Sequence, residues 1–144
     1  MSRAWLLAAL LAAGCVGPVG PFAGGPLVGG VLVTAPVESW PFADERILEL
    51  ETDPQDPRSV NMHFVAEGPH LWVATILGES STWAQSVLAD DRVRLRVGDS
   101  IYERRAVRVT DRAEIVHVAE LYRDKYVISP DVEEYESALV FRLE

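Results

Sequence analysis

The stretch Ser81–Thr110, STWAQSVLADDRVRLRVGDSIYERRAVRVT, decides the fold of this chain. Its first third places Trp83, Val87 and Leu88 at helical spacing, after a serine that can cap a helix. From residue 92 the apolar residues recur at every second position, which indicates a β-strand. Gly98 supplies the positive φ that a tight turn requires, so the sequence predicts a short helix followed by a β-hairpin.

Each strand of the predicted hairpin separates apolar from charged side chains. On the first strand, Val93, Leu95 and Val97 share one face, and three arginines share the other. On the return strand the pattern predicts an apolar face made of Ile101, Val107 and Val109. The opposite face of that strand is predicted to hold Tyr102, Arg104, Ala106 and Arg108. A hairpin with one apolar face is unstable alone, so further strands must cover it.

Alternating patterns predict further strands on both sides of the hairpin. These strands are expected at 46–52, 59–66, 71–77 and 138–143, with an edge strand at 31–35. Two prolines make residues 53–57 a loop, and Trp40 and Phe42 are expected to plug the mouth of the domain. Asp111 and Glu114 form a capping-box-like pair that begins a second helix. The predicted fold class is therefore mostly β with two helices, closed into a small antiparallel barrel.

The first residues of the chain predict export from the cytoplasm. Arg3 precedes an apolar run from Ala4 to Ala13, which is too short to cross a bilayer and is typical of a signal peptide. The run ends at Gly14-Cys15, and Cys15 is the only cysteine among the 144 residues. This arrangement resembles the lipobox of bacterial lipoproteins, in which the cysteine is lipidated and becomes the mature N-terminus. The alternative is an ordinary secretory signal with an unlipidated cysteine.

The chain is thus predicted to have three parts: a lipoprotein signal peptide at 1–14, a lipidated Cys15 with a Gly/Pro-rich tether at 15–30, and a barrel domain at 31–144. The tether is expected to be a linker that lifts the domain off the membrane, because its contour reaches about 50 Å at ~3.3 Å per residue. The alternative is that part of it lies against the barrel, since Phe22, Leu27 and Val28 are apolar.

The charge of the chain limits its partners. It has 22 acidic and 13 basic residues, a formal net charge of −9. Such acidity disfavours binding to nucleic acid or to an anionic lipid surface, so the membrane must be reached through the lipid on Cys15. Val16, rather than Asp, follows the cysteine. In a Gram-negative cell envelope this favours the periplasmic side of the outer membrane.

The pattern WxxxxLxDDxVxLxVG at residues 83–98 is similar to the helix and hairpin of flavin-binding split barrels. That family includes pyridoxamine-phosphate-oxidase-like proteins and deazaflavin-dependent nitroreductases. The order of predicted strands over residues 47–77 is also as in the family, and the resemblance covers about residues 47–126. It implies a small antiparallel split barrel, FMN or deazaflavin as cofactor, and a homodimer.

In that family, basic and glycine residues in the loop after the first strand hold the cofactor phosphate. Here the loop at 52–59 has two aspartates and two prolines, and only Arg58 and Ser59 could bind phosphate. For a flavin-binding protein the resemblance implies a site formed by Arg58, Ser59, Trp83, Arg94 and Arg96. The hairpin arginines could instead bind a small anionic ligand, or form only a solvated strand face.

The sequence identifies no catalytic residue. No two of the three histidines have the spacing of metal ligands, and no serine lies in a G-x-S-x-G motif, so we expect no metal site and no serine hydrolase. Two functions stay open. The favoured one is an envelope lipoprotein whose domain is a non-catalytic ligand-binding or accessory module without a cofactor. The other is a flavin- or deazaflavin-dependent oxidoreductase.

Overall fold

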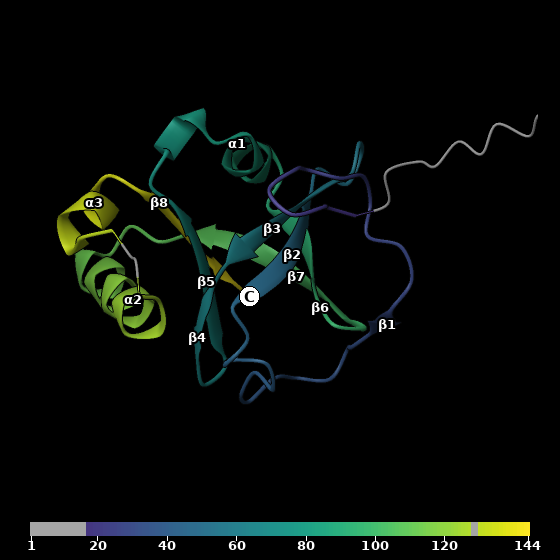
Figure 1. Cartoon of the computed structure of the whole chain (residues 1–144), viewed down its shortest axis with the longest axis horizontal. Helices are drawn as coiled ribbons and strands as arrows, with labels where there is room; N and C mark the ends of the chain where they lie inside the picture. The colour runs from purple at the N-terminus through teal and green to yellow at the C-terminus, as the bar shows by residue number, and fades with distance from the viewer. Residues whose placement is uncertain (1–16, 128–129) are drawn as a thin grey trace, which may run out of the picture.

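The structure is a computed structural model that describes residues 17–127 and 130–144. It is an antiparallel β half-barrel flanked by helices (Figure 1). The strands are β1 (Val31–Leu32), β2 (Ile47–Thr52), β3 (Arg58–His63), β4 (Val65–Glu67), β5 (His70–Thr75), β6 (Arg92–Val97), β7 (Ser100–Arg108) and β8 (Leu139–Leu143). The helices are the 3₁₀ turn η1 (Gly78–Ser80), α1 (Thr82–Ala89), α2 (Arg112–Lys125) and α3 (Val132–Glu136). Within the described ranges, no helix is both long and apolar enough to cross a membrane.

The sheet follows the order β3-β2-β6-β7-β8-β5-β4, and each neighbouring pair in this order is antiparallel. The short β1 adds to the start of β7 in parallel. Strand β7 pairs with β6 through residues 100–105 and with β8 through residues 106–108. It is therefore shared by the two halves of the barrel.

The β6–β7 hairpin is confirmed, but one of its predicted faces is wrong. Leu95 pairs with Tyr102, and Val93 pairs with Arg104. Residues paired across a ladder point to the same face, so Tyr102 enters the core beside Leu95 and is only 4% exposed. Val107, expected inside, is 37% exposed. The alternation misled because a tyrosine ring is apolar although its hydroxyl is polar.

Helix α1 begins where the sequence indicated and buries a narrower face than expected. Ser81 occupies the N-cap position without a side-chain capping hydrogen bond, and Ala84 and Val87 are buried. Trp83 is partly buried against the main core, whereas Leu88 is largely exposed. The predicted plug of Trp40 and Phe42 is also part of that core, with the Trp40 ring 5.0 Å from that of Tyr102.

The predicted strand at 59–66 is in fact two strands. The chain breaks at Phe64, where it passes from β3, paired with β2, to β4, paired with β5. The Tyr126 hydroxyl donates a hydrogen bond to the Phe64 carbonyl oxygen at 2.7 Å. The same hydroxyl accepts a hydrogen bond from the Phe64 amide at 3.1 Å. Lys125 Nζ donates to the same carbonyl, and burial lowers the pKa of Lys125 to about 8. Alternation alone did not predict the break because both strands keep the same period.

The second helix is confirmed, and a third was not predicted. Asp111 accepts a hydrogen bond from the Glu114 amide at 2.9 Å, which caps α2. The Glu114 carboxylate turns away from the cap and instead accepts from Trp72 Nε1 at 2.8 Å and from Arg142 at 2.5 Å. Helix α3 has only five residues, too few to produce a recognisable periodicity. The fold therefore has three α-helices in the described ranges, not the two predicted.

Residues 17–33, here called the strap, lie against the sheet. Gly24 and Ser59 exchange two backbone hydrogen bonds of 2.8 and 3.1 Å. The Leu27 amide donates to Glu51 Oε2 at 2.6 Å, and the Leu27 side chain is 4% exposed. Residues 17–30 of the predicted tether therefore lie in contact with the barrel. They do not form a free linker. The predicted signal peptide and Cys15 lie outside the described residues.

Candidate functional site

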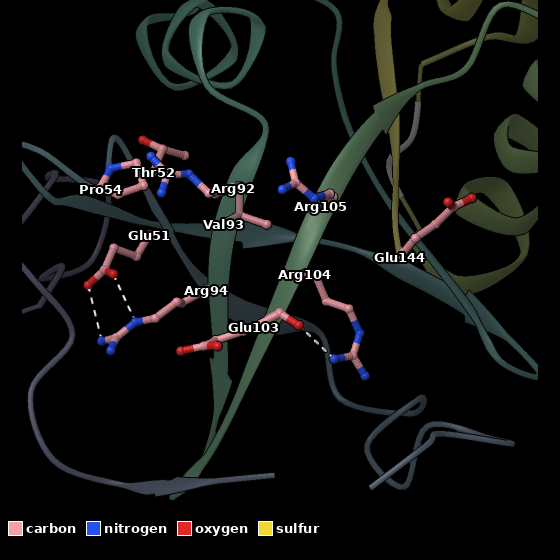
Figure 2. A pocket seen from close by; sticks show the side chains of 10 residues that line it. All are labelled: Glu51, Thr52, Pro54, Arg92, Val93, Arg94, Glu103, Arg104, Arg105 and Glu144. Atoms are coloured by element: carbon pink, nitrogen blue, oxygen red, sulfur yellow. Dashed lines mark hydrogen bonds and ion pairs between the residues drawn. The ribbon is translucent and has the colours of Figure 1, made fainter. Parts of the chain in front are cut away.

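The cavity with the most charged lining lies beside the arginine-rich hairpin. It has a volume of about 540 Å³ and is open to solvent. Figure 2 shows that β2, β6, β7 and the chain end contribute to it. Its lining consists of Glu51, Thr52, Pro54, Arg92, Val93, Arg94, Glu103, Arg104, Arg105 and Glu144. Four guanidinium groups at one cavity are the kind of lining that could bind an anion.

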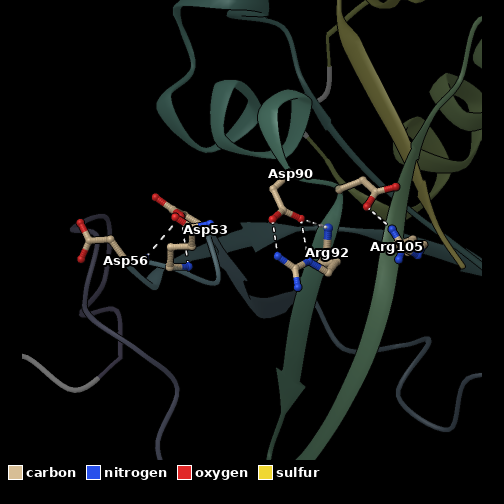
Figure 3. Close-up of polar contacts among 7 residues, drawn as sticks. Asp53, Asp56, Asp90, Arg92 and Arg105 are labelled. Atoms are coloured by element: carbon tan, nitrogen blue, oxygen red, sulfur yellow. Dashed lines mark hydrogen bonds and ion pairs between the residues drawn. The ribbon is translucent and has the colours of Figure 1, made fainter.

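Three of these arginines are already paired with carboxylates of the same chain. Arg94 Nε lies 2.9 Å from Glu51 Oε1, and Arg94 Nη2 also donates to the Leu27 carbonyl oxygen at 2.7 Å. Arg92 forms two side-chain hydrogen bonds with Asp90, of 3.0 and 2.6 Å. Arg105 Nη1 donates to Asp91 at 2.5 Å (Figure 3). These carboxylates leave little positive charge for an external anion.

Pairing shifts the pKa values of Asp90 and Arg96. Hydrogen bonds from Arg92 lower the pKa of Asp90 to about 2, so this carboxylate stays ionised throughout the physiological pH range. Outside the cavity, Arg96 pairs with Glu49, and this hydrogen bond raises the pKa of Arg96. The ion pair between Asp90 and Arg92 therefore stays charged across the physiological pH range.

Arg104 is the one cavity arginine without a carboxylate partner in the described structure. Its guanidinium lies 5.2 Å from the Trp40 ring centre and 5.5 Å from that of Tyr102, a cation–π arrangement. It donates to the backbone carbonyl oxygen of Glu103 at 2.7 Å. In Figure 2 its side chain points away from that of Glu103, and burial lowers the pKa of Arg104. Arg104 thus packs against the aromatic rings of Trp40 and Tyr102.

The loop after β2 uses its own polar groups internally (Figure 3). Asp53 has a φ of 55°, and its Oδ1 accepts from the amides of Gln55 and Asp56 at 3.3 Å each. Arg58 pairs with Asp56 at 3.2 Å, with both side chains well exposed. The amide donors and the single cation that a phosphate would need in this loop therefore already have acidic partners.

The five residues proposed for a cofactor site do not meet at one place. Arg94 lines the cavity, whereas Arg96 donates to the Val28 carbonyl oxygen of the strap at 3.0 Å and pairs with Glu49. Ser59 is fully buried, and its hydroxyl donates to the Gly25 carbonyl oxygen at 2.6 Å. Arg58 is paired with Asp56. Trp83 packs against Phe141, with 5.8 Å between the two ring centres.

The acidic partners of the arginine face were not predicted from the sequence. Glu49 and Glu51 alternate on β2 with the same period as the arginines of β6. In the sheet, Glu49 pairs in register with Arg96, and Glu51 pairs with Arg94. Two alternating stretches of opposite charge are a signal that could have predicted this ladder of ion pairs. No group of three His, Cys, Asp or Glu residues that could hold a metal ion occurs in the described ranges.

No protein-family model and no curated protein sequence matches this chain. Its structure, however, is similar to several solved structures. One is a candidate pyridoxamine 5′-phosphate oxidase from Listeria innocua, with a TM-score of 0.54 and 16% identity over 69% of this chain and 83% of that one. The domain is a split barrel.

Two further solved structures are similar to this chain. A FAD-binding protein from Mesorhizobium loti has a TM-score of 0.52 and 14% identity, over 71% of this chain and 82% of that one. Another structure, a domain-swapped dimer, has a TM-score of 0.55 and 23% identity, over 70% and 81%. The fold implied by the sequence resemblance is confirmed, and at these identities the likeness concerns the fold alone.

Proposed function

We propose that this chain is a membrane-anchored lipoprotein whose split-barrel domain is a non-catalytic accessory or ligand-binding module. The observation that carries the proposal is the internal neutralisation of the arginines at the cavity. The sequence feature that supports the anchor is Gly14-Cys15 at the end of a short apolar run. The envelope, on the periplasmic side of the outer membrane in a Gram-negative cell, is the location that this anchor implies.

A flavin phosphate does not fit the described residues. The cavity has four arginines, three glutamates in its lining, and two aspartates that pair with Arg92 and Arg105. Glu144 pairs with Arg142, which is not part of the lining, at 2.7 Å. Four carboxylates therefore remain against four guanidinium groups, and a doubly charged phosphate would find no net positive charge at the cavity. The nearby loop amides that could compensate donate to Asp53 instead. We therefore assign no redox step to this domain.

The second candidate is a flavin- or deazaflavin-dependent oxidoreductase. The observation in its favour is the fold, because a solved split barrel of similar structure is described as FAD-binding. A homodimer fits either candidate, since another solved structure that is similar to this chain is described as a domain-swapped dimer. Cofactor binding separates the two candidates directly.

We expect the purified domain to be colourless and to show no saturable binding of FMN or a deazaflavin. The physical reason is that Arg58 of the loop after β2 and Arg94 of the cavity are already paired with carboxylates, while Arg104 packs against aromatic rings. The measurement is a fluorescence titration into the high micromolar range, with a flavin-binding split barrel as positive control. A yellow preparation, or saturable quenching that Arg58→Ala abolishes, would favour the oxidoreductase.

We expect the wild-type chain to fractionate with membranes and Cys15→Ala to remain soluble. Acyl chains on one cysteine provide about 0.8 kcal/mol per buried CH₂, and the acidic domain gains no attraction from anionic lipid. The measurement is membrane fractionation followed by quantitative immunoblotting. Val16→Ala is the matched control and should fractionate like the wild type. Equal distribution of the wild type and Cys15→Ala would refute the anchor.

A further inference from the structure

We propose that the turn formed by residues 19–22, at the start of the strap, is a membrane-contact element. It would place the side chains of Val19 and Phe22 in the interfacial layer of the bilayer and so fix which end of the barrel faces the membrane. This inference rests on the proposed lipid anchor at Cys15. The partner is a lipid surface, recognised through apolar contact.

The turn is an ordered hairpin whose apolar side chains point into solvent. The Val19 amide donates to the Phe22 carbonyl oxygen at 3.1 Å, and the Phe22 amide donates to the Val19 carbonyl oxygen at 3.0 Å. Asn61 Nδ2 donates to the Gly20 carbonyl oxygen at 3.0 Å, which ties the tip of the turn to β3. Val19 is 72% exposed and Phe22 is 73% exposed. Both side chains are therefore held outward by the backbone.

The base of the turn is fixed just as firmly. A Cβ on Gly24 would lie 1.6 Å from the Gly17 carbonyl oxygen, so the two backbones touch and only glycine fits there. Gly24 in turn exchanges backbone hydrogen bonds with Ser59 of β3. The turn is thus part of the folded domain and cannot swing freely at the end of a linker.

The position of the lipid follows from chain length. Gly17 is buried against the domain, and Cys15 precedes it by two residues. Two fully extended residues span at most about 7 Å, so acyl chains on Cys15 would bring the bilayer surface close to Gly17. The exposed side chains of Val19 and Phe22 follow within five residues of Gly17. The domain would therefore rest against the membrane and not stand away from it.

The strap carries a large share of the exposed apolar side chains. The described structure has eleven large apolar side chains that are substantially exposed, and five of them belong to the strap. The five are Val19, Phe22, Val28, Val31 and Leu32. Burial of such apolar surface in the lipid interface is favourable, whereas the acidic domain has no charge attraction to offer. The contact should consequently depend little on salt or on anionic lipid.

The test uses the lipidated full chain with one added thiol at the tip of the turn, Pro21→Cys, carrying an environment-sensitive fluorophore. Cys15 is consumed by its lipid, so the label reacts only at the new position. Leu77→Cys is the matched control, because Leu77 is 67% exposed and outside the strap. In phosphatidylcholine vesicles we expect quenching by spin-labelled lipid to be at least about threefold stronger at Pro21→Cys than at Leu77→Cys. Adding Phe22→Ser to Pro21→Cys should reduce this difference.

The outcomes separate the two proposals. If both labelled proteins float with the vesicles but are quenched equally by lipid and by aqueous iodide, the membrane-contact element is refuted while the anchor stands. If neither protein floats, the lipid anchor is refuted, and the contact element is refuted with it. Strong lipid quenching at Pro21→Cys that Phe22→Ser leaves unchanged would also overturn the proposal, because the contact would then not depend on the apolar side chain.

Discussion

Leu95→Ala is expected to lower the free energy of unfolding by about 2–5 kcal/mol, because it removes a fully buried side chain from a packed core. Leu95 pairs with Leu50 on β2 and with Tyr102 on β7, so it lies in the middle of the sheet. The strands on both sides hold the backbone in place, so a cavity would remain where the removed methyl groups were. Urea denaturation followed by tryptophan fluorescence measures the loss.

Leu77→Ala is the matched control for this variant, since it makes the same chemical change at a side chain that is 67% exposed. We expect its free energy of unfolding to change by no more than about 0.5 kcal/mol. Equal stabilities for Leu95→Ala and the wild type would mean that the inner face of the hairpin has been assigned to the wrong side.

Glu51→Ala is expected to lower the free energy of unfolding by about 2–3 kcal/mol, because one carboxylate has two buried or half-buried partners. Glu51 Oε2 accepts from the Leu27 amide at 2.6 Å, and Glu51 Oε1 lies 2.9 Å from Arg94 Nε. Without the carboxylate, the buried Leu27 amide has no acceptor. The Arg94 side chain is 35% exposed, so water reduces the cost of its lost partner and keeps the total below that of a fully buried pair.

Glu103→Ala is the control for Glu51→Ala. Glu103 also lines the cavity, but its side chain is exposed and has no ion-pair partner in the described structure, so its removal should change the stability by less than about 0.5 kcal/mol. Both variants are compared by urea denaturation. A Glu51→Ala protein as stable as Glu103→Ala would show that the contacts of Glu51 with Leu27 and Arg94 contribute nothing measurable to stability.

Much of the fold was predictable because it depends on local patterns. The alternation around Leu95 and the glycine at Gly98 predicted the hairpin, and the Asp111 cap predicted the start of α2. Each of these signals is contained within a few neighbouring residues. The family resemblance then predicted the split barrel, which the solved structures confirm.

The remaining features depend on contacts between distant residues. The Gly/Pro-rich strap lacks any periodic pattern. It docks through hydrogen bonds between its backbone and side chains of the sheet, such as those of Glu51 and Ser59. The break at Phe64 depends on the Tyr126 hydroxyl, which is 62 residues away in sequence. At the candidate site, the arginines were visible in the sequence, but their neutralisation required the register between β2 and β6.

Because β7 pairs with β6 over one part and with β8 over another, it couples the unfolding of the two halves. Opening either half removes the partners of one end of this strand while the other end stays paired. Separate melting of the halves would therefore break a single continuous strand in the middle, which disfavours a stable half-folded species. The amide hydrogens along β7 are consequently expected to exchange with solvent mainly through global unfolding.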